Sequence, residues 1–268
     1  MEQYGSTGRR LERRERREAG PEAGSAGREA QPARDARRAL ALIGFIGVLL
    51  AVDTQFDAQA QLLLGLAAWL ALALAVRGVA PVLRAQALVV VVVATCAEIV
   101  GSIIWGVYTY RLENLPSFVP PCHGLVYLAG AAIAASAANS RLQGVLVRVA
   151  LVAVLVWGIA GITVLPRTDV AGAVGAALLA VYLVHGRAPA IYAGVFLVVA
   201  WLELYGTAIG TWEWAVTIPG SGIPQGNPPS GVASGYVWFD IVALALAPFV
   251  IRSGARIRSG WRALPDSA

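Results

Sequence analysis

Long apolar runs alternate with short polar stretches over most of the chain. Eight such runs are present, at 39–52, 62–76, 87–108, 121–138, 149–165, 171–184, 191–214 and 232–250. A helix needs about 20 residues to cross a bilayer, so the first, second and sixth runs must recruit small or polar residues at their ends. The pattern predicts an all-α polytopic membrane protein with eight transmembrane helices.

The positions of the arginines orient these spans. All 21 basic residues are Arg, and 19 of them fall in the inner segments when both termini are placed in the cytoplasm. The outer segments keep only Arg111 and Arg167. Positive charges are enriched in cytoplasmic loops, so we expect a multi-pass protein of the plasma (cytoplasmic) membrane with cytoplasmic N- and C-termini.

Composition excludes a soluble globular domain, and the charge pattern argues against a nucleic-acid partner. Of the 268 residues, 57% are hydrophobic and 14% are charged, against about 25% charged in soluble proteins, which excludes a soluble globular domain. Residues 1–38 hold ten Arg and seven acids, and we expect a disordered cytoplasmic tail there and a second basic tail at 251–268. The interleaved acids argue against nucleic acid as a partner and favour contact with acidic lipid headgroups.

A tandem repeat divides the eight spans into two groups of four. The sequence EIVGSIIWGVYTY, which begins at Glu98, reappears as ELYGTAIGTWEW from Glu203, and a Pro-containing outer loop follows each copy. Because four is an even number, the two copies share one orientation in the membrane. We therefore expect two tandem four-helix repeats of the same orientation, at 39–138 and 139–250.

Glu98 and Glu203 are expected near the bilayer midplane. Each lies about 17 Å into its span at 1.5 Å per residue, and an ionised acid there costs about 2.5 to 3.5 kcal/mol, so both should face the bundle interior. Gly101 and Gly206 lie on the same helical faces and would let a neighbouring helix approach closely. Two roles stay open: the acids clasp the two halves by hydrogen bonds, or they form an acid–base pair in a central cavity.

Three further polar residues are site candidates. Asp240 is a third acid inside an apolar span, without a counterpart in the first copy. His123 begins the fourth span at the outer face, where it either relays protons or serves as an ordinary hydrogen-bonding residue. The outer loop 218–231 is either a segment that lines the site or a simple helix terminator, and Asn227 is its best candidate for a specific polar contact. No spacing of Cys and His predicts a metal site, and no motif predicts a cofactor.

The Glu-x-x-Gly pattern, followed by a small residue and an aromatic-x-aromatic pair, resembles the membrane proteins of carotenoid biosynthesis that include the carotenoid 1,2-hydratases. Tyr108 and Tyr110 match the aromatic pair. Trp212 and Trp214 match it more loosely, because Trp replaces Tyr and the residue between them is Glu213. The resemblance covers about 40 residues in each half.

This resemblance implies a cofactor-free, lyase-type enzyme that adds water to an isoprenoid or carotenoid double bond in the bilayer, or starts a rearrangement by protonating it. It implies Glu98 or Glu203 as the acid and Asp240 as its partner. The four aromatic residues would form a substrate-binding wall that stabilises a carbocation.

Two other classes of function fit the same sequence. Midplane carboxylates in two parallel repeats also suit a transporter or lipid translocator. A non-catalytic membrane partner subunit, docking through the uncharged outer loop, is the third possibility.

Overall fold

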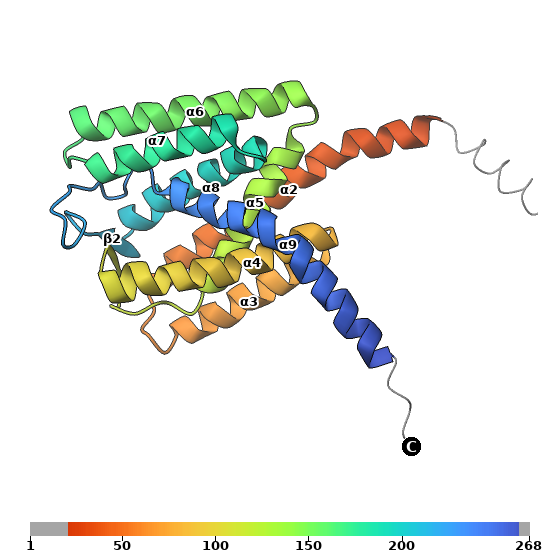
Figure 1. Cartoon of the computed structure of the whole chain (residues 1–268). Coiled ribbons are helices and arrows are strands. Elements are labelled where there is room, and N and C mark those ends of the chain that lie inside the picture. Colours follow the sequence, from red (N-terminus) through yellow and green to blue (C-terminus); the bar gives the residue numbers. More distant parts are fainter. Residues whose placement is uncertain (1–20, 263–268) are drawn as a thin grey trace, which may run out of the picture.

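The computed structural model describes residues 21–262, and the side chains of residues 31–254. Eight helices account for most of this part of the chain (Figure 1). In chain order the elements are α2 (Pro21–Asp53), α3 (Gln61–Arg77), α4 (Pro81–Glu98), the π-helix η1 (Ile99–Trp105), β1 (Tyr108–Tyr110), α5 (Val119–Ser136), α6 (Ser140–Thr163), α7 (Val170–His185), α8 (Pro189–Ala208), β2 (Trp212–Trp214) and α9 (Ala233–Arg262). The predicted all-α architecture with eight helices is confirmed, and two three-residue strands add to it.

Five of these helices are long and apolar enough to cross a membrane. They are α4 with η1, α5, α6, α8 and the part of α9 that ends at Gly254. Helices α3 and α7 are apolar but have only 17 and 16 residues. These two carry the second and sixth predicted runs, which were already short in the sequence.

Two apolar runs end earlier as helices than the sequence predicted. The runs 87–108 and 191–214 were expected to stay helical up to their aromatic residues. In the structure Gly106 and Gly210 take positive φ angles of 73° and 76°, which a residue with a side chain rarely adopts. The chain therefore leaves each helix at a glycine, and the aromatic pairs lie on strands.

The ends of the described chain also differ from the expected tails. Helix α2 begins at Pro21, so the part 21–38 of the predicted disordered tail is helical. Helix α9 continues to Arg262, well past the predicted boundary at 250. Both helices project beyond the bundle in Figure 1. Residues 1–20 and 263–268 of the predicted tails lie outside the described residues.

The same order of elements occurs twice, as three helices, a strand and a helix. The packing crosses between the two sets: α4 packs against α9, and its counterpart α8 packs against α5. At the α5–α8 contact, a Cβ atom placed on Gly194 would lie 2.2 Å from the carbonyl oxygen of Gly130, so only glycine permits this approach. The first helices differ, because α2 packs on α5 whereas α6 packs on α7 and α8. Four central helices, α4, α5, α8 and α9, therefore surround the site.

Candidate acid–base site

Two short strands join the two helices that carry the acids. β1 and β2 pair antiparallel, with Tyr108 opposite Trp214 and Tyr110 opposite Trp212. Alternate residues of a strand point to the same face, so the four aromatic side chains share one side of the strand pair. The rings meet across the pair, at centroid distances of 4.6 Å for Tyr108 and Trp214 and 6.2 Å for Tyr110 and Trp212.

Glu98, the last residue of α4, has three polar partners and is 7% exposed. The hydroxyls of Tyr108 and Tyr110 donate to its Oε2 at 2.7 and 2.9 Å. His123 Nε2 lies 2.9 Å from the other oxygen, Oε1. A neutral phenol donates a hydrogen bond but does not take up a proton, whereas an imidazole can do both, so His123 is the neighbour that can exchange a proton with Glu98.

His123, near the start of α5, belongs to this site. It is 4% exposed and packs against the rings of Tyr236 and Phe239, at centroid distances of 5.0 and 5.9 Å. Its Nδ1 is buried without a hydrogen-bond partner among the described residues. The imidazole is therefore held at Glu98 by one polar contact and by aromatic packing.

Glu203 on α8 is 3% exposed and has a different set of neighbours. The indole N–H groups of Trp212 and Trp214 both donate to its Oε2, at 3.0 and 3.1 Å. The hydroxyl of Tyr236 is its other polar neighbour. Because an indole N–H only donates, Oε2 must accept, and a proton on this carboxyl group must sit on Oε1.

Gly101 and Gly206 make room for aromatic side chains rather than for a neighbouring helix. A Cβ atom on Gly206 would lie 2.0 Å from Cη2 of Trp212. A Cβ atom on Gly101 would lie 3.2 Å from Cε1 of Tyr108. In each half, the first aromatic residue of the strand folds back over the helical turn that follows the acid, and glycine there leaves the space it needs.

Both carboxyl groups line one cavity of about 640 Å³. The two acids are close enough to interact electrostatically. Aromatic and polar residues form one part of the lining: Tyr108, Tyr110, His123, Trp212, Trp214 and Tyr236. Apolar residues of α2, α4, η1, α5, α8 and α9 form most of the rest. The polar groups that the cavity offers an apolar ligand are therefore the two acids and the side chains bound to them.

A second cavity of about 290 Å³ lies at the strand pair and shares Tyr110 and Trp212 with the first. Its other lining residues are polar or charged for the most part, and include Arg111, Glu213 and Asn227. Water can occupy a site with this many polar groups. The strand aromatics therefore separate an apolar cavity from a polar one.

The phenol of Tyr110 remains a proton donor over the ordinary pH range. Burial, followed by the nearby carboxyl group of Glu98, raises the pKa of Tyr110 well above its usual value. A neutral phenol keeps its O–H, so the hydrogen bond to Glu98 persists as the pH rises.

Two of the predicted site residues lie apart from the acid pair. Asp240 is 1% exposed but does not line the 640 Å³ cavity, and its Oδ2 has no hydrogen-bond partner among the described residues. Its electrostatic neighbours are Tyr127 and Tyr192. Asn227 accepts a hydrogen bond from the backbone N–H of Trp214 at 3.0 Å and lines only the polar cavity.

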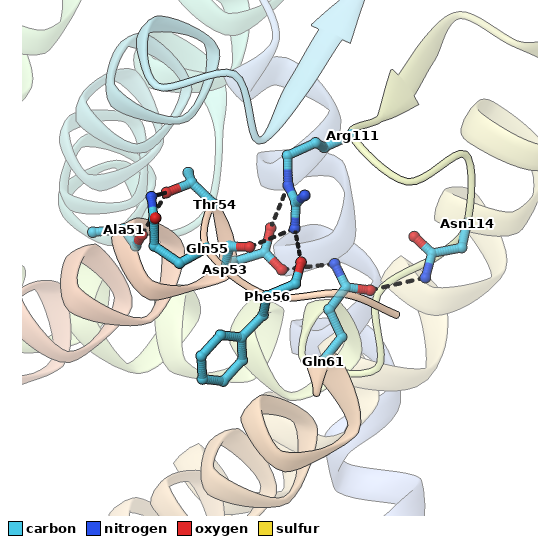
Figure 2. A network of polar contacts seen from close by, with 8 residues as sticks. All are labelled: Ala51, Asp53, Thr54, Gln55, Phe56, Gln61, Arg111 and Asn114. Carbon is cyan, nitrogen blue, oxygen red and sulfur yellow. Dashed lines mark hydrogen bonds and ion pairs between the residues drawn. The ribbon is translucent and has the colours of Figure 1, made fainter. Parts of the chain in front are cut away.

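A polar network fixes the outer end of β1 to the first two helices. Figure 2 shows Arg111, which follows β1, donating to the carbonyl oxygens of Asp53 and Phe56 and pairing with the Asp53 carboxylate at 3.7 Å. Gln61 donates to Asp53 at 2.6 Å and accepts from Asn114 at 2.8 Å (Figure 2). In the second half, the other outer arginine, Arg167, donates to the carbonyl oxygen of Trp214 at 2.6 Å. Each outer arginine thus supports one strand.

Asp169 organises the loop that follows β2, a role that the sequence did not predict. It caps α7 by accepting from the N–H of Gly172, and it also accepts from the N–H groups of Gly226 and Ser230 and from the Ser230 hydroxyl. The residue is 1% exposed. Its position directly before an apolar run is typical of a helix cap, and that was the available signal.

Comparisons with known proteins found no relative. No family model matches the chain, and no curated protein or solved structure matches it either. Within residues 21–262, no group of three or more His, Cys, Asp or Glu is placed to hold a metal ion. The chemistry of the site therefore has to be argued from its own residues.

Proposed function

We propose that this protein is an integral membrane enzyme that protonates a double bond of a membrane-dissolved isoprenoid or carotenoid without a cofactor. Water then adds to the carbocation, or the cation rearranges and loses a proton. One observation carries the proposal: Glu98 and Glu203, both buried, line one apolar cavity together with aromatic rings. The resemblance to the carotenoid 1,2-hydratase group points to the same substrate class.

Glu203 is the proposed proton donor. The two indoles hold its Oε2 as an acceptor, so the proton resides on Oε1. Its transfer to an alkene carbon breaks the π bond, forms a C–H bond and leaves a cation on the neighbouring carbon. The two N–H groups already point at the carboxylate that remains, so they stabilise the charge that develops on it.

Glu98 and His123 are the proposed base. When water attacks the cation, a C–O bond forms and the oxygen must lose a proton. Glu98 can take that proton and pass it to His123, while the phenols of Tyr108 and Tyr110 hold its other oxygen by hydrogen bonds. The polar cavity beyond Tyr110 and Trp212 is a suitable source of the water.

The aromatic rings are suited to stabilise the cation. Tyr108, Trp214 and Tyr236 line the same cavity as the acids. The face of an aromatic ring attracts a cation within about 6 Å, and the attraction grows when water is excluded. These side chains therefore have two functions, as hydrogen-bond donors to the acids and as the wall of the reaction cavity.

The same proposal places eight helices across the plasma membrane, as two parallel repeats at 39–138 and 139–250 with both termini in the cytoplasm. Support comes from the five long apolar helices, the repeated order of elements and the arginine distribution. Helices α3 and α7 span only about 25 Å at 1.5 Å per residue. Local thinning of the bilayer or flanking residues would complete their crossing.

The experiment that tests the function is mass spectrometry of lipids extracted from a host that makes C30 to C50 isoprenoids, with and without this protein. We expect a product heavier than its precursor by one water, or an isomer of equal mass. Glu203→Gln should remove the product, and Asp35→Asn, at a half-buried acid of α2 that does not line the cavity, is the control that should retain it.

An unchanged lipid profile in that host would contradict the enzymatic proposal. Reconstitution in liposomes then separates the remaining functions. Movement of an isoprenoid or of protons across the bilayer, lost in Glu203→Gln, would establish a transporter or translocator in its place.

A further inference from the structure

The cavity that holds the two acids is not closed on the outer surface of the bundle. Part of its lining comes from exposed residues of α4 and η1, with exposed fractions of 63% for Val92, 50% for Val100 and 52% for Trp105. Cys96, on the same helix, is also exposed and also lines the cavity. A residue that is exposed and lines the cavity marks the place where the cavity opens.

Helix α9 forms the other side of this opening. Trp238, 49% exposed, and Gly235, also exposed, both line the cavity. The two residues are three apart, so they lie on one face of the helix. Helices α4 and α9 pack side by side, as the yellow and blue ribbons of Figure 1 show. The opening therefore lies between α4–η1 and α9.

The opening faces the region that lipid would occupy. Both of its sides belong to helices long and apolar enough to cross a membrane, the segments Pro81–Trp105 and Ala233–Gly254. The exposed residues around it are Val, Trp, Cys and Gly, none of them charged. In a bilayer such a surface meets acyl chains, so an apolar molecule could reach the acids without passing through water.

Gly235 keeps the opening wide. A Cβ atom built on this glycine would meet no other atom within 4 Å, so the space beside its Cα is unfilled. The next residue, Tyr236, is a polar neighbour of Glu203 deeper in the cavity. Gly235 thus lies between the outer surface and the acid, where any larger side chain would narrow the passage.

The size of the cavity indicates how a long substrate would occupy the opening. Cavities of about 300 to 1,000 Å³ enclose a ligand the size of a typical drug, and this one measures about 640 Å³. An extended isoprenoid of 30 to 50 carbons is longer than a compact cavity of this volume is wide. One end of such a chain can reach the acids only if the remainder passes out through the opening and stays in the lipid.

We propose that the gap between α4–η1 and α9 is a lateral portal, through which a long apolar chain inserts one end from the bilayer, and that Gly235 sets its width. The substrate class rests on the proposed function, whereas the portal itself does not.

Cysteine labelling tests the portal without any need for catalysis. The chain has two cysteines, and both line the cavity: Cys96 is exposed at the opening and Cys122 is half-buried inside it. In liposomes, Cys96→Ser leaves Cys122 as the only thiol, and Cys122→Ser leaves Cys96. Each full-length variant is treated with phenylmercuric acetate, an apolar thiol reagent that partitions into lipid, and the mass increase is followed over time.

Gly235→Trp should slow the labelling of Cys122 at least tenfold and leave that of Cys96 nearly unchanged. Gly44→Trp is the matched control, because Gly44 is also a helical glycine with no atom near its Cβ position, but it does not line the cavity. Gly235→Leu, a smaller change, should give an intermediate rate and provides a second variant if tryptophan impairs folding.

Three results would overturn the portal. They are equal labelling of Cys122 with and without the change at Gly235, no labelling of Cys122 by the apolar reagent in the parent protein, and faster labelling by a charged, membrane-impermeant reagent. The outcome is separate from that of the proposed function: if Glu203→Gln retains all activity, the acid mechanism fails, while the labelling result still decides the portal.

Discussion

Glu98 and Glu203 occupy equivalent places on two similar backbones, yet their neighbours differ. Each lies on a helix, three residues before a glycine. The two aromatic residues of the strand that follows the helix donate hydrogen bonds to one of its carboxylate oxygens. In the first half those donors are phenols, joined by His123; in the second half they are indoles. The arrangement of acid, glycine and strand is thus repeated, although a π-helix follows Glu98 and α8 stays α-helical to Ala208. The proton chemistry is not repeated.

This difference shows how a duplicated frame can hold two roles. Glu98 has an imidazole beside it that can exchange a proton, which suits an acid that must pass a proton on. Oε2 of Glu203 is held by two indole N–H groups that never accept, which confines the proton to Oε1, with the Tyr236 hydroxyl as the remaining polar neighbour. The comparison is therefore a hypothesis about division of labour, and each prediction below is chosen to break it or to sharpen it.

The largest effect is expected from the acids themselves. Glu203→Gln should lower the rate of product formation by at least about 100-fold, because general acid catalysis contributes about 10²- to 10⁴-fold. Glu98→Gln should also lose hydration, yet Glu203 in that variant still protonates the alkene reversibly. In D₂O, mass spectrometry should find deuterium in the isoprenoid recovered from Glu98→Gln but not from Glu203→Gln.

The deuterium pattern decides the assignment. Equal incorporation in both variants would show that the acids are interchangeable, and incorporation only in Glu203→Gln would reverse the roles. Wild-type activity in both variants would end the acid mechanism.

The two glycines should differ strongly in their tolerance of a methyl group. In Gly206→Ala the Cβ would lie 2.0 Å from the Trp212 ring, which is itself hydrogen-bonded to Glu203. We expect a loss of about 3 kcal/mol in unfolding free energy, the upper end for overpacking. Gly101→Ala, at 3.2 Å from the half-buried Tyr108, should lose less than about 1 kcal/mol by the same principle.

Unfolding of both variants in detergent, with equal solvent and protein concentration, measures this difference. A loss at Gly101→Ala as large as that at Gly206→Ala would mean that the first half is packed as tightly as the second. The difference in packing between the Tyr pair of the first half and the Trp pair of the second half would then be absent.

The contrast between these halves also separates what the sequence predicted from what it did not. Hydropathy and arginine placement located all eight helices, because each helix must bury or solvate a continuous apolar run. The repeat identified the acids, since charged groups in apolar spans are rare. The coarse fold was therefore readable from the pattern, which also singled out the two acids that line one cavity.

The strands and the partners of the acids were harder to predict. A three-residue strand has no periodicity to detect, and the positive φ angles at Gly106 and Gly210 that end the helices are set by the site as a whole. His123 and Tyr236 come from helices far away in the sequence, so only tertiary packing reveals that they meet at the acids. Asp240 attracted attention as a buried acid, but it does not line the cavity, although Tyr236 and Phe239 on the same turn of α9 do.

A smaller effect is expected from removing one phenol. Tyr110→Phe deletes the O–H that donates to Glu98 at 2.9 Å and keeps the ring. A hydrogen bond to a charged group contributes about 1.5 to 3 kcal/mol, and the low end applies because Tyr108 still donates to the same oxygen. Activity should fall about tenfold by this measure.

Tyr205→Phe is the control for that change, since the Tyr205 hydroxyl makes no hydrogen bond with the described residues and its ring stacks on Trp201. It should keep full activity. A Tyr110→Phe enzyme that is equally active would show that the donors to Glu98 do not matter for catalysis, and would remove one side of the comparison.

The smallest effect should come from Asn227, and it tests which of two roles this residue has. The sequence suggested a contact with the substrate, whereas the structure shows its Oδ1 accepting from the backbone N–H of Trp214 at 3.0 Å, at an exposed position. Water can replace an exposed acceptor, so Asn227→Ala should cost less than about 1 kcal/mol in stability and lower activity by less than tenfold. Ser221→Ala is the control, because it removes a different polar contact of the same loop, the hydrogen bond from the Ser221 hydroxyl to the carbonyl oxygen of Ile218. A loss of activity well above tenfold at unchanged stability would mean that Asn227 acts on the substrate directly. In that case β1 and β2 would form part of the substrate site as well as the frame that holds the two acids.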